Sequence, residues 1–226
     1  MPRSFFGVIA CLSLFLLVPV VTQAANINEI APSTTTMIVN STTTAPIVAS
    51  HPDKIDINAL QTYWLDRINA LRATKNLRLL TIDPRFTQTA TEWATHMAAI
   101  GQATHVRPNG FSMHQWIDAK HLPFTKRYSS GGWKTNYFSE NIAWGYTDNS
   151  LASAKAALDE TLRFMLAEAK TNGPHYRTIY YPDWNTVGVG FYFKPVGKNR
   201  YQLFTAFHYG SLQPLTTTST SSTPSL

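Results

Sequence analysis

The chain has 226 residues, of which 44% are hydrophobic and 14% are charged, and its formal net charge is +6. The hydrophobic share is large enough to form a core, so a wholly disordered chain is excluded. The basic residues form no stripe or block, which argues against a nucleic-acid-binding protein. The single cysteine, Cys11, lies in the first apolar run. Intrachain disulfides, cysteine zinc sites, iron–sulfur clusters and thiol catalysis are therefore excluded for the rest of the chain.

Residues 1–24 have the pattern of a secretory signal peptide. Arg3 supplies a positive charge, Phe5 to Val21 is apolar, and Thr22-Gln23-Ala24 places small residues where a signal peptidase reads. We expect cleavage after Ala24 and a protein that is secreted or displayed at the cell surface. The alternative is an uncleaved membrane anchor, because the apolar run approaches the short end of a spanning helix.

Two segments rich in Thr, Ser and Pro flank a central domain. Residues 25–52 and 214–226 contain too little apolar surface to offset the entropy of an ordered chain. We therefore expect a disordered linker, a folded domain over residues 53–213 and a disordered tail. Asn40 begins a glycosylation sequon, which has meaning only in a eukaryotic secretory route.

Three segments have apolar residues at helical spacing. The first predicted helix runs from about Leu60 to Ala73. The second begins at Pro84, which follows the capping residue Asp83, and ends before Gly101. The third runs from about Leu151 to Ala169.

Three segments are predicted to be strands. Residues 186–194 and 200–209 flank a loop of hairpin length, and residues 139–146 form a further strand. The hairpin strands carry aromatic residues at both odd and even positions, which indicates that both faces of the sheet are covered. We therefore predict an α+β fold with helices on both sides of a small antiparallel sheet.

Polar residues at unexpected positions are the candidates for a site. Glu140 shares the apolar face of its strand, so its carboxylate needs hydrogen-bond donors or a cation. Glu168 lies beside the apolar stripe near the end of the third helix, and His175 follows a Pro that opens a short helical turn. His105 lies in the loop after the second helix, and His208, in the last strand, is placed to line a cleft. Taken singly, each residue is also compatible with an ordinary surface or core position.

Four motifs follow one another along the domain: Leu65-Asp66-Arg67-Ile68-Asn69-Ala70-Leu71-Arg72, Ser139-Glu140-Asn141-Ile142-Ala143, Gly173-Pro174-His175-Tyr176-Arg177 and Val187-Gly188-Val189-Gly190. In this order they resemble the CAP superfamily, which comprises the cysteine-rich secretory proteins, antigen 5 and pathogenesis-related 1 and is also called the SCP domain. The similarity is greatest to its cysteine-free bacterial branch. Ser139 departs from the glycine that the family usually has before Glu-Asn-Ile.

The resemblance implies a three-layer α-β-α sandwich with a cleft that holds two His and two Glu. In this sequence the four residues correspond to His105, Glu140, Glu168 and His175. Two imidazoles and two carboxylates in one cleft suit a divalent ion such as Zn²⁺ or Mg²⁺, so we expect all four to be metal ligands. We expect the cleft to be lined also by His208, Tyr176 and Asn141.

The resemblance, together with these residues, predicts a secreted CAP-domain protein that binds a divalent metal. The resemblance also implies a partner that is an apolar small molecule (a lipid or sterol) or a component of a cell wall or host surface. One alternative is a metal-assisted, peptidase-like hydrolase, since the same groups can serve as acid and base. The other is a structural adhesion module in which the four residues only stabilise the fold. No catalytic residue and no organic cofactor is assigned, because no motif for a specific reaction accompanies the four residues.

Overall fold

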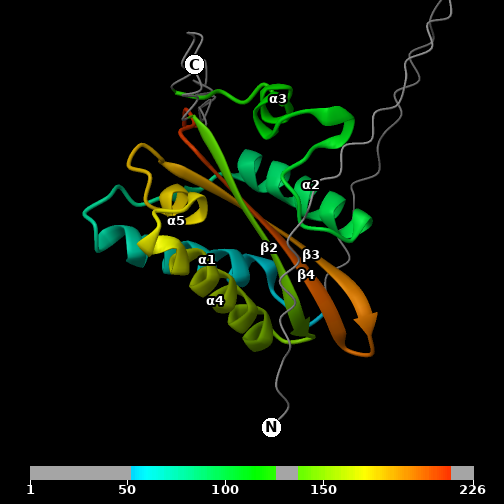
Figure 1. Cartoon of the computed structure of the whole chain (residues 1–226). Helices are drawn as coiled ribbons and strands as arrows, with labels where there is room; N and C mark the ends of the chain where they lie inside the picture. Colours follow the sequence, from blue (N-terminus) through cyan, green and yellow to red (C-terminus); the bar gives the residue numbers. More distant parts are fainter. Residues whose placement is uncertain (1–51, 126–136, 215–226) are drawn as a thin grey trace, which may run out of the picture. The chain divides into compact units, whose positions relative to one another are not determined.

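One four-stranded sheet organises the domain (Figure 1). The computed structural model describes residues 52–125 and 137–214. In chain order, the elements are α1 (Ile57–Ala73), β1 (Thr81–Ile82), α2 (Pro84–Ile100), the 3-10 helix η1 (Pro108–Gly110), α3 (Met113–Asp118), β2 (Phe138–Asp148), α4 (Leu151–Ala167), the 3-10 helix η2 (Glu168–Lys170), α5 (Pro174–Ile179), β3 (Thr186–Gly197) and β4 (Arg200–Gly210).

The strands lie in the order β1-β3-β4-β2. β3 and β4 form the predicted hairpin, and β2 pairs antiparallel with β4 over its whole length, from Phe138 opposite Gly210 to Asp148 opposite Arg200. The additional strand β1 pairs parallel with β3, so the sheet is mixed rather than purely antiparallel. β1 contains only two residues, which is too short for any alternating pattern to reveal it.

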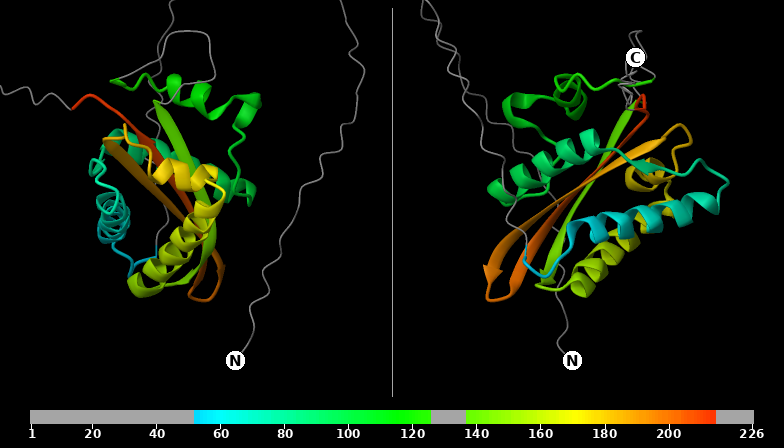
Figure 2. Two further views of the ribbon diagram at one scale, coloured as in Figure 1. Left: turned by 60° about the vertical axis from the view of Figure 1, so that its left-hand side comes forward. Right: turned by 180° about the vertical axis from the view of Figure 1, so that it is seen from behind.

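Helices cover both faces of the sheet, as predicted (Figures 1 and 2). On one face, Leu60 and Trp64 of α1 and Leu158 of α4 form one core with residues of β3 and β4. Trp64 stacks on Phe207 of β4 with ring centroids 3.8 Å apart. On the other face, residues of α2, including Trp93, pack in a second core. The described residues therefore form an α-β-α sandwich.

Two glycines of the motif in β3 allow α2 to lie directly against the sheet. A Cβ atom at Gly188 would overlap the backbone of Phe86, and one at Gly190 would overlap the backbone of Ala90. The alternating valines point to the opposite face, where Val187 belongs to the core beneath α1 and α4. The Val-Gly-Val-Gly pattern therefore separates a filled core face from a face on which a helix touches the strand backbone.

The predicted helix ends are largely confirmed. The carboxylate of Asp56 caps α1, that of Asp83 caps α2, and Gly101 ends α2 with a left-handed φ of 72°. The third predicted helix is two residues shorter than expected, because α4 ends at Ala167 and continues as η2. The sequence interpretation missed α3, a six-residue helix whose start is fixed by a capping box between Ser112 and Gln115.

The predicted signal peptide lies outside the described residues, as do nearly all of the predicted linker and tail. Contacts divide the chain into the units Met1–Ala45 and Pro46–Leu226, and every described residue belongs to the second unit. Among the described helices, none combines the length and the apolar character needed to cross a membrane.

Candidate functional site

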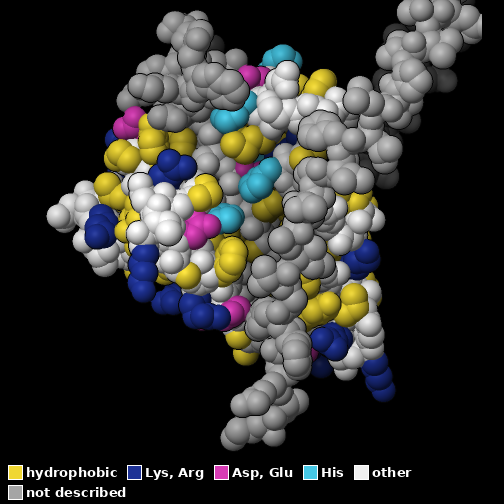
Figure 3. Space-filling view, in the orientation of Figure 1, with side chains coloured by type: hydrophobic (Ala, Val, Ile, Leu, Met, Phe, Trp, Pro, Cys, Tyr) yellow, Lys and Arg dark blue, Asp and Glu magenta, His cyan; other side chains and the backbone are white. Residues whose placement is uncertain are grey.

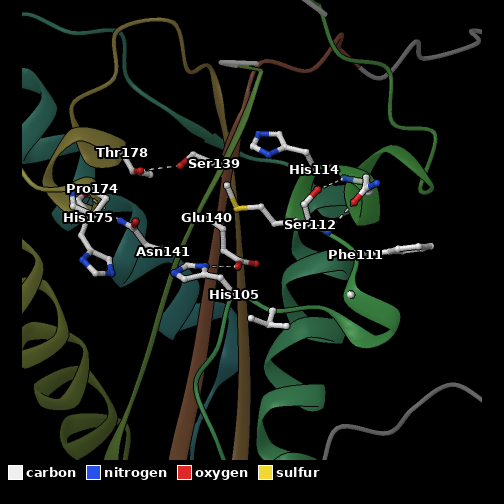
Figure 4. A pocket seen from close by; sticks show the side chains of 14 residues that line it. His105, Phe111, Ser112, His114, Ser139, Glu140, Asn141, Pro174, His175 and Thr178 are labelled. Atoms are coloured by element: carbon white, nitrogen blue, oxygen red, sulfur yellow. Dashed lines mark hydrogen bonds and ion pairs between the residues drawn. The ribbon is translucent and has the colours of Figure 1, made fainter. Parts of the chain in front are cut away.

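A pocket opens beside the start of β2, between the loop that joins α2 to α3 and the first turn of α5 (Figure 4). Its volume is about 780 Å³. Figure 3 shows histidine and acidic side chains close together on this face of the molecule. The residues that line the pocket include His105, Phe111, Met113, Glu140, Asn141 and His175.

Three consecutive residues of β2 fix both walls of the pocket. The hydroxyl of Ser139 lies 2.8 Å from that of Thr178, and the side-chain amide of Asn141 donates to the backbone carbonyl of His175 at 3.2 Å. Both contacts attach α5 to the strand. Glu140 points to the other side of the sheet because side chains alternate along a strand, and there it holds the loop after α2. The Ser139 hydroxyl, present where the family usually has glycine, therefore gains a structural contact.

The carboxylate of Glu140 lies at the centre of a buried network. Arg107 donates to both of its oxygens, with Nη1 3.0 Å from Oε1 and Nη2 2.5 Å from Oε2. His105 Nδ1 lies 2.8 Å from Oε1, and His208 Nε2 lies 2.8 Å from Oε2. The side chains of Glu140, Arg107 and His208 have no solvent exposure. The donors and the cation that a buried carboxylate requires are therefore all present.

This network keeps Glu140 ionised. Burial alone raises the pKa of its carboxyl group, but the hydrogen bonds from His105, His208 and Arg107 outweigh burial and hold the pKa far below its usual value. An ionised carboxylate only accepts hydrogen bonds, so Nδ1 of His105 carries the hydrogen. In the neutral ring the lone pair is then on Nε2, and the side chain is 48% exposed at the pocket.

The sequence interpretation missed Arg107. Its guanidinium lies between two indoles, 3.5 Å from the ring centroid of Trp93 and 4.8 Å from that of Trp116. Such stacking suits a planar, weakly hydrated cation. The available signal was indirect, because the burial expected for Glu140 called for a cation. An arginine in a loop gives no pattern that identifies it as that cation.

His208 is placed differently from the prediction. We expected it to line the cleft, but it is fully buried and lies behind Glu140, outside the residues that line the pocket. Its Nδ1 lies 2.8 Å from the hydroxyl of Thr89 on α2. Burial lowers the pKa of His208. The hydrogen bond to Glu140 raises it, but burial is the larger effect, so the pKa lies below its usual value. The side chain of His208 points to the face of the sheet that α2 covers. The sequence alone could not show which part of this face the helix covers.

Glu168 and His175 form a second pair at the opposite wall. Glu168 Oε1 lies 2.6 Å from His175 Nδ1, and Oε2 accepts the backbone N–H groups of His175 and Tyr176 at 2.8 and 3.4 Å. Burial raises the pKa of Glu168, but the contacts with His175 and the two backbone donors outweigh it and lower the pKa. Gly173 leaves room for this carboxylate, since a Cβ atom there would lie 2.5 Å from Glu168 Oε2.

The four predicted residues thus form two His–Glu pairs at one pocket. His105, Glu140 and His175 line it, and Glu168 contacts it through His175. The four do not form one set of ligands: in the part of the chain that the structure describes, no group of three or more His, Cys, Asp or Glu is placed to hold a metal ion. Of the other predicted lining residues, Asn141 lines the pocket, whereas Tyr176 does not and packs on Tyr180.

One further lining residue was missed. His114 of α3 lines the pocket, and its ring packs edge-on against Tyr137 and Phe138. The sequence interpretation placed it in a polar loop. The Ser112-x-x-Gln115 spacing was the signal for a helix start at this point.

The chain is similar to one protein family and to several solved structures. The sequence profile of the "Cysteine-rich secretory protein family" (CAP) matches residues 65–209. A search of curated protein sequences finds no significant match. One similar solved structure is an outer surface protein from Borrelia burgdorferi, with 20% identity, a TM-score of 0.47 and coverage of 72% of this chain and 100% of that one.

Two other similar structures belong to longer proteins. An extracellular protein containing an SCP domain from Bacillus anthracis has 17% identity and a TM-score of 0.46, with coverage of 68% of this chain and 41% of that one. The CAP domain of enterococcal PrgA has 16% identity and a TM-score of 0.44, with coverage of 68% and 62%. The profile match covers more than half of the chain and includes both His–Glu pairs up to His208. This chain is therefore a member of the cysteine-rich secretory protein (CAP) family.

Proposed function

We propose that the protein is an exported CAP protein whose pocket binds one divalent metal ion through Nε2 of His105 and Nε2 of His175. One observation carries this proposal: each imidazole has its Nδ1 against a glutamate, at 2.8 Å in one pair and 2.6 Å in the other. In the described part of the chain no hydrogen bond engages either Nε2. Histidines that ligate metals commonly have this arrangement, with a carboxylate fixing the ring from behind.

The two glutamates act as orienting groups in this proposal, and not as ligands. Glu140 already accepts hydrogen bonds from Arg107, His105 and His208. Glu168 accepts from His175 and from two backbone N–H groups. Neither carboxylate can turn toward an ion without losing these bonds. A bound ion would therefore have two protein ligands, with water completing its shell, and it would act as a Lewis acid toward a molecule in the pocket.

Zinc titration by calorimetry tests the metal site. We expect His105→Ala and His175→Ala each to weaken Zn²⁺ binding at least tenfold. Glu168→Gln, which leaves both imidazoles in place, should weaken binding by about 10- to 100-fold. The matched control is His121→Asn, which removes an exposed imidazole at a left-handed position with φ of 53° where Asn is tolerated. Unchanged affinity in the His105→Ala/His175→Ala double variant would remove the proposed site.

We further propose that the pocket takes an amphiphilic ligand. Its histidines and Glu140 are at one side, while Val106, Phe111 and Met113 contribute apolar surface from the loop and α3. Val106 is 69% exposed and Phe111 is 46% exposed, although large apolar side chains usually avoid water. Dodecanoate is a suitable probe for titration. We expect binding that Phe111→Ser weakens, and equal binding by this variant would contradict the assignment.

Export is proposed from the N-terminal sequence pattern and from membership of a family of secretory proteins. Mass spectrometry of protein collected outside expressing cells tests it. We expect the mature chain to begin at Ala25, after removal of residues 1–24. Retention of these residues in a membrane fraction would favour the uncleaved anchor.

Metal-assisted hydrolysis is the second candidate. The observation that favours it is the solvent exposure of the His105 ring at the pocket, which would leave an ion bound at Nε2 open to water and to a substrate. A peptide and cell-wall substrate screen with and without chelator separates the two functions. Turnover that the chelator and Glu168→Gln both abolish would establish the hydrolase, whereas metal binding without turnover favours a binding protein.

A further inference from the structure

An aromatic pair on β2 remains exposed far from the pocket. Trp144 and Tyr146 are each 50% exposed, and their rings meet edge-to-face with centroids 5.7 Å apart. They occupy the same face of the sheet as Glu140 and Ile142, which other elements cover. At about 3.3 Å per residue, Tyr146 lies about 20 Å along the strand from Glu140. The pair is therefore separate from the candidate metal site.

The helix that covers this face, α2, lies over β3 and ends level with the pair. Tyr146 is in register with Gln202 of β4, which is in register with Lys194 of β3. The ammonium group of Lys194 donates to the carbonyl of Ala98, in the last turn of α2, at 3.0 Å. On this face α2 therefore does not continue beyond the row of Tyr146. Figures 1 and 2 show the end of the β3–β4 hairpin extending past α2.

Arg200 contacts the aromatic pair, and a second basic side chain lies at the adjacent hairpin turn. The guanidinium of Arg200 lies over the ring of Tyr146 at 4.6 Å from its centroid. Lys198 is exposed at the hairpin turn, next to Val196, which is 45% exposed. In Figure 3 hydrophobic and basic side chains gather over the ends of β2, β3 and β4. We call this surface the hairpin patch, and it consists of Trp144, Tyr146, Val196, Lys198 and Arg200.

Acidic groups near the hairpin patch do not cancel its positive charge. Asp148 of β2 lies opposite Arg200 in the register, and its carboxylate accepts a hydrogen bond from Ser150 at 2.5 Å. Asp53 is hydrogen-bonded to Asn149 in the neighbouring turn, and the adjacent Lys54 balances it. Lys194, Lys198 and Arg200 therefore outnumber the one remaining carboxylate.

We propose that the hairpin patch docks this protein on an anionic lipid bilayer. Trp and Tyr have an apolar body and a polar tip, and both concentrate at the boundary between lipid headgroups and acyl chains. Lys and Arg beside them would contact lipid phosphates, and the attraction to an anionic surface adds to the apolar contact. Val196, which is 45% exposed near the turn of the β3–β4 hairpin, adds apolar surface beside Lys198. This inference is independent of the metal site.

The geometry favours a bilayer over a polysaccharide. A sugar ring stacks on a free, flat aromatic face. The rings of Trp144 and Tyr146 are perpendicular, with an interplanar angle of 90°, so they offer no continuous platform, and Arg200 covers one face of Tyr146. Insertion among lipid headgroups requires no such platform.

Vesicle co-sedimentation tests the proposal. The protein begins at Ala25, so that the apolar run at residues 5–21 is absent while the whole core, from Ile55 to Leu212, is retained. The vesicles contain phosphatidylcholine alone or with 30 mol% phosphatidylglycerol, a composition that we choose for the assay. We expect binding to the anionic vesicles that falls as salt is raised from low to physiological concentration. Lys198→Gln/Arg200→Gln should weaken it by about fivefold for each charge, or about 25-fold in total.

A matched control variant changes equivalent residues on another surface. Lys75 and Arg78 are exposed in the segment between α1 and β1, where Leu79 is 55% exposed. Lys75→Gln/Arg78→Gln removes the same charge from this segment, and Leu79→Ser removes an exposed apolar side chain. Both should bind anionic vesicles as the parent protein does. Equal weakening in the control and hairpin variants would overturn the assignment to this surface.

Brominated lipids supply a readout that a purely structural role would not change. Bromine on the acyl chains quenches the fluorescence of a tryptophan that inserts below the headgroups. Of the other described tryptophans, Trp64, Trp93 and Trp184 are buried and Trp116 is half-buried. We expect quenching in the parent protein that Trp144→Phe largely removes. Absence of binding to anionic vesicles, or quenching that survives Trp144→Phe, would refute the proposal. Binding to insoluble cell-wall polysaccharide that requires Trp144, without vesicle binding, would assign the patch to a glycan instead.

Discussion

Replacing Glu140 by Gln tests the buried network most severely. The amide keeps the shape of the side chain but removes the charge that Arg107 pairs with at 3.0 and 2.5 Å. Both side chains are fully buried, so the guanidinium would keep its desolvation cost without its counter-ion. Loss of one partner of a buried ion pair typically costs about 3–5 kcal/mol. For a domain of this size, that corresponds to a fall in Tm of roughly 6–20 °C.

Urea unfolding followed by tryptophan fluorescence measures this effect. The control is Glu160→Gln, because Glu160 is 49% exposed and pairs with Arg163 at the surface of α4, where such pairs contribute about 0–1 kcal/mol. Adding Arg107→Met to Glu140→Gln should cost less than the sum of the single changes, since the unpaired charge is then gone. A loss below about 1 kcal/mol for Glu140→Gln, or strict additivity of the pair, would refute the reasoning.

The same network predicts how stability depends on pH. The folded-state pKa of Glu140 is lowered, so its contribution is complete above the usual value of 4.5 and is lost as the pH falls below it. His208 also has a lowered pKa, so the unfolded chain binds more protons and stability falls as the pH drops below the usual 6.5. The parent protein should therefore lose stability from pH 7 to pH 3. Glu140→Gln should show a smaller loss below pH 4.5, and an equal loss in both proteins would contradict this assignment.

Three other substitutions have defined outcomes. Gly173→Ala places a Cβ atom 2.5 Å from Glu168 Oε2 and should displace this carboxylate from His175. Zinc binding measured by calorimetry should weaken about tenfold or more. Normal affinity would show that the Glu168–His175 pair tolerates the displacement. Gly190→Ala forces α2 away from the sheet at Ala90 and should destabilise the fold by about 1–3 kcal/mol in urea unfolding. An unchanged unfolding midpoint would contradict the close approach of α2 to β3. The Nη1 atom of the buried Arg72 donates to the carbonyls of Ile179 and Tyr181 at 2.7 and 3.0 Å, and a lysine cannot reproduce this fork. Arg72→Lys should therefore cost about 1–3 kcal/mol in urea unfolding, whereas full stability would show that the charge alone suffices.

Helices and strands with long periodic patterns were predictable from the sequence. Asp83, Pro84 and Gly101 mark the ends of α2 with local chemistry that no distant contact needs to support. The short elements were harder to predict, although the Ser112-x-x-Gln115 capping box marks the start of α3. β1 has two residues and depends on pairing with β3, and α3 has six residues and buries only Ile117. Such elements are set by tertiary contacts more than by their own sequence.

The candidate site was predictable in its residues but not in its connections. Glu140 shares one face of β2 with apolar residues, which indicated that it is buried, and the family resemblance related it to His105, Glu168 and His175. This alternation of faces alone could not show that the four residues would form two His–Glu pairs. The pairing depends on Arg107, whose loop has no periodicity to reveal burial between two indoles. The partners of a buried charge that are distant in sequence can be identified only from the three-dimensional arrangement of the helices and the sheet.

In the proposed metal site the two glutamates orient the imidazoles from behind and leave both Nε2 atoms for a metal ion. An anomalous difference map at the zinc edge, from crystals grown with Zn²⁺, tests this arrangement. We predict one peak within bonding distance of Nε2 of His105 and Nε2 of His175, with Glu140 still paired to Arg107. A peak bonded to a Glu140 or Glu168 oxygen, or no peak between the two rings, would contradict the proposed site.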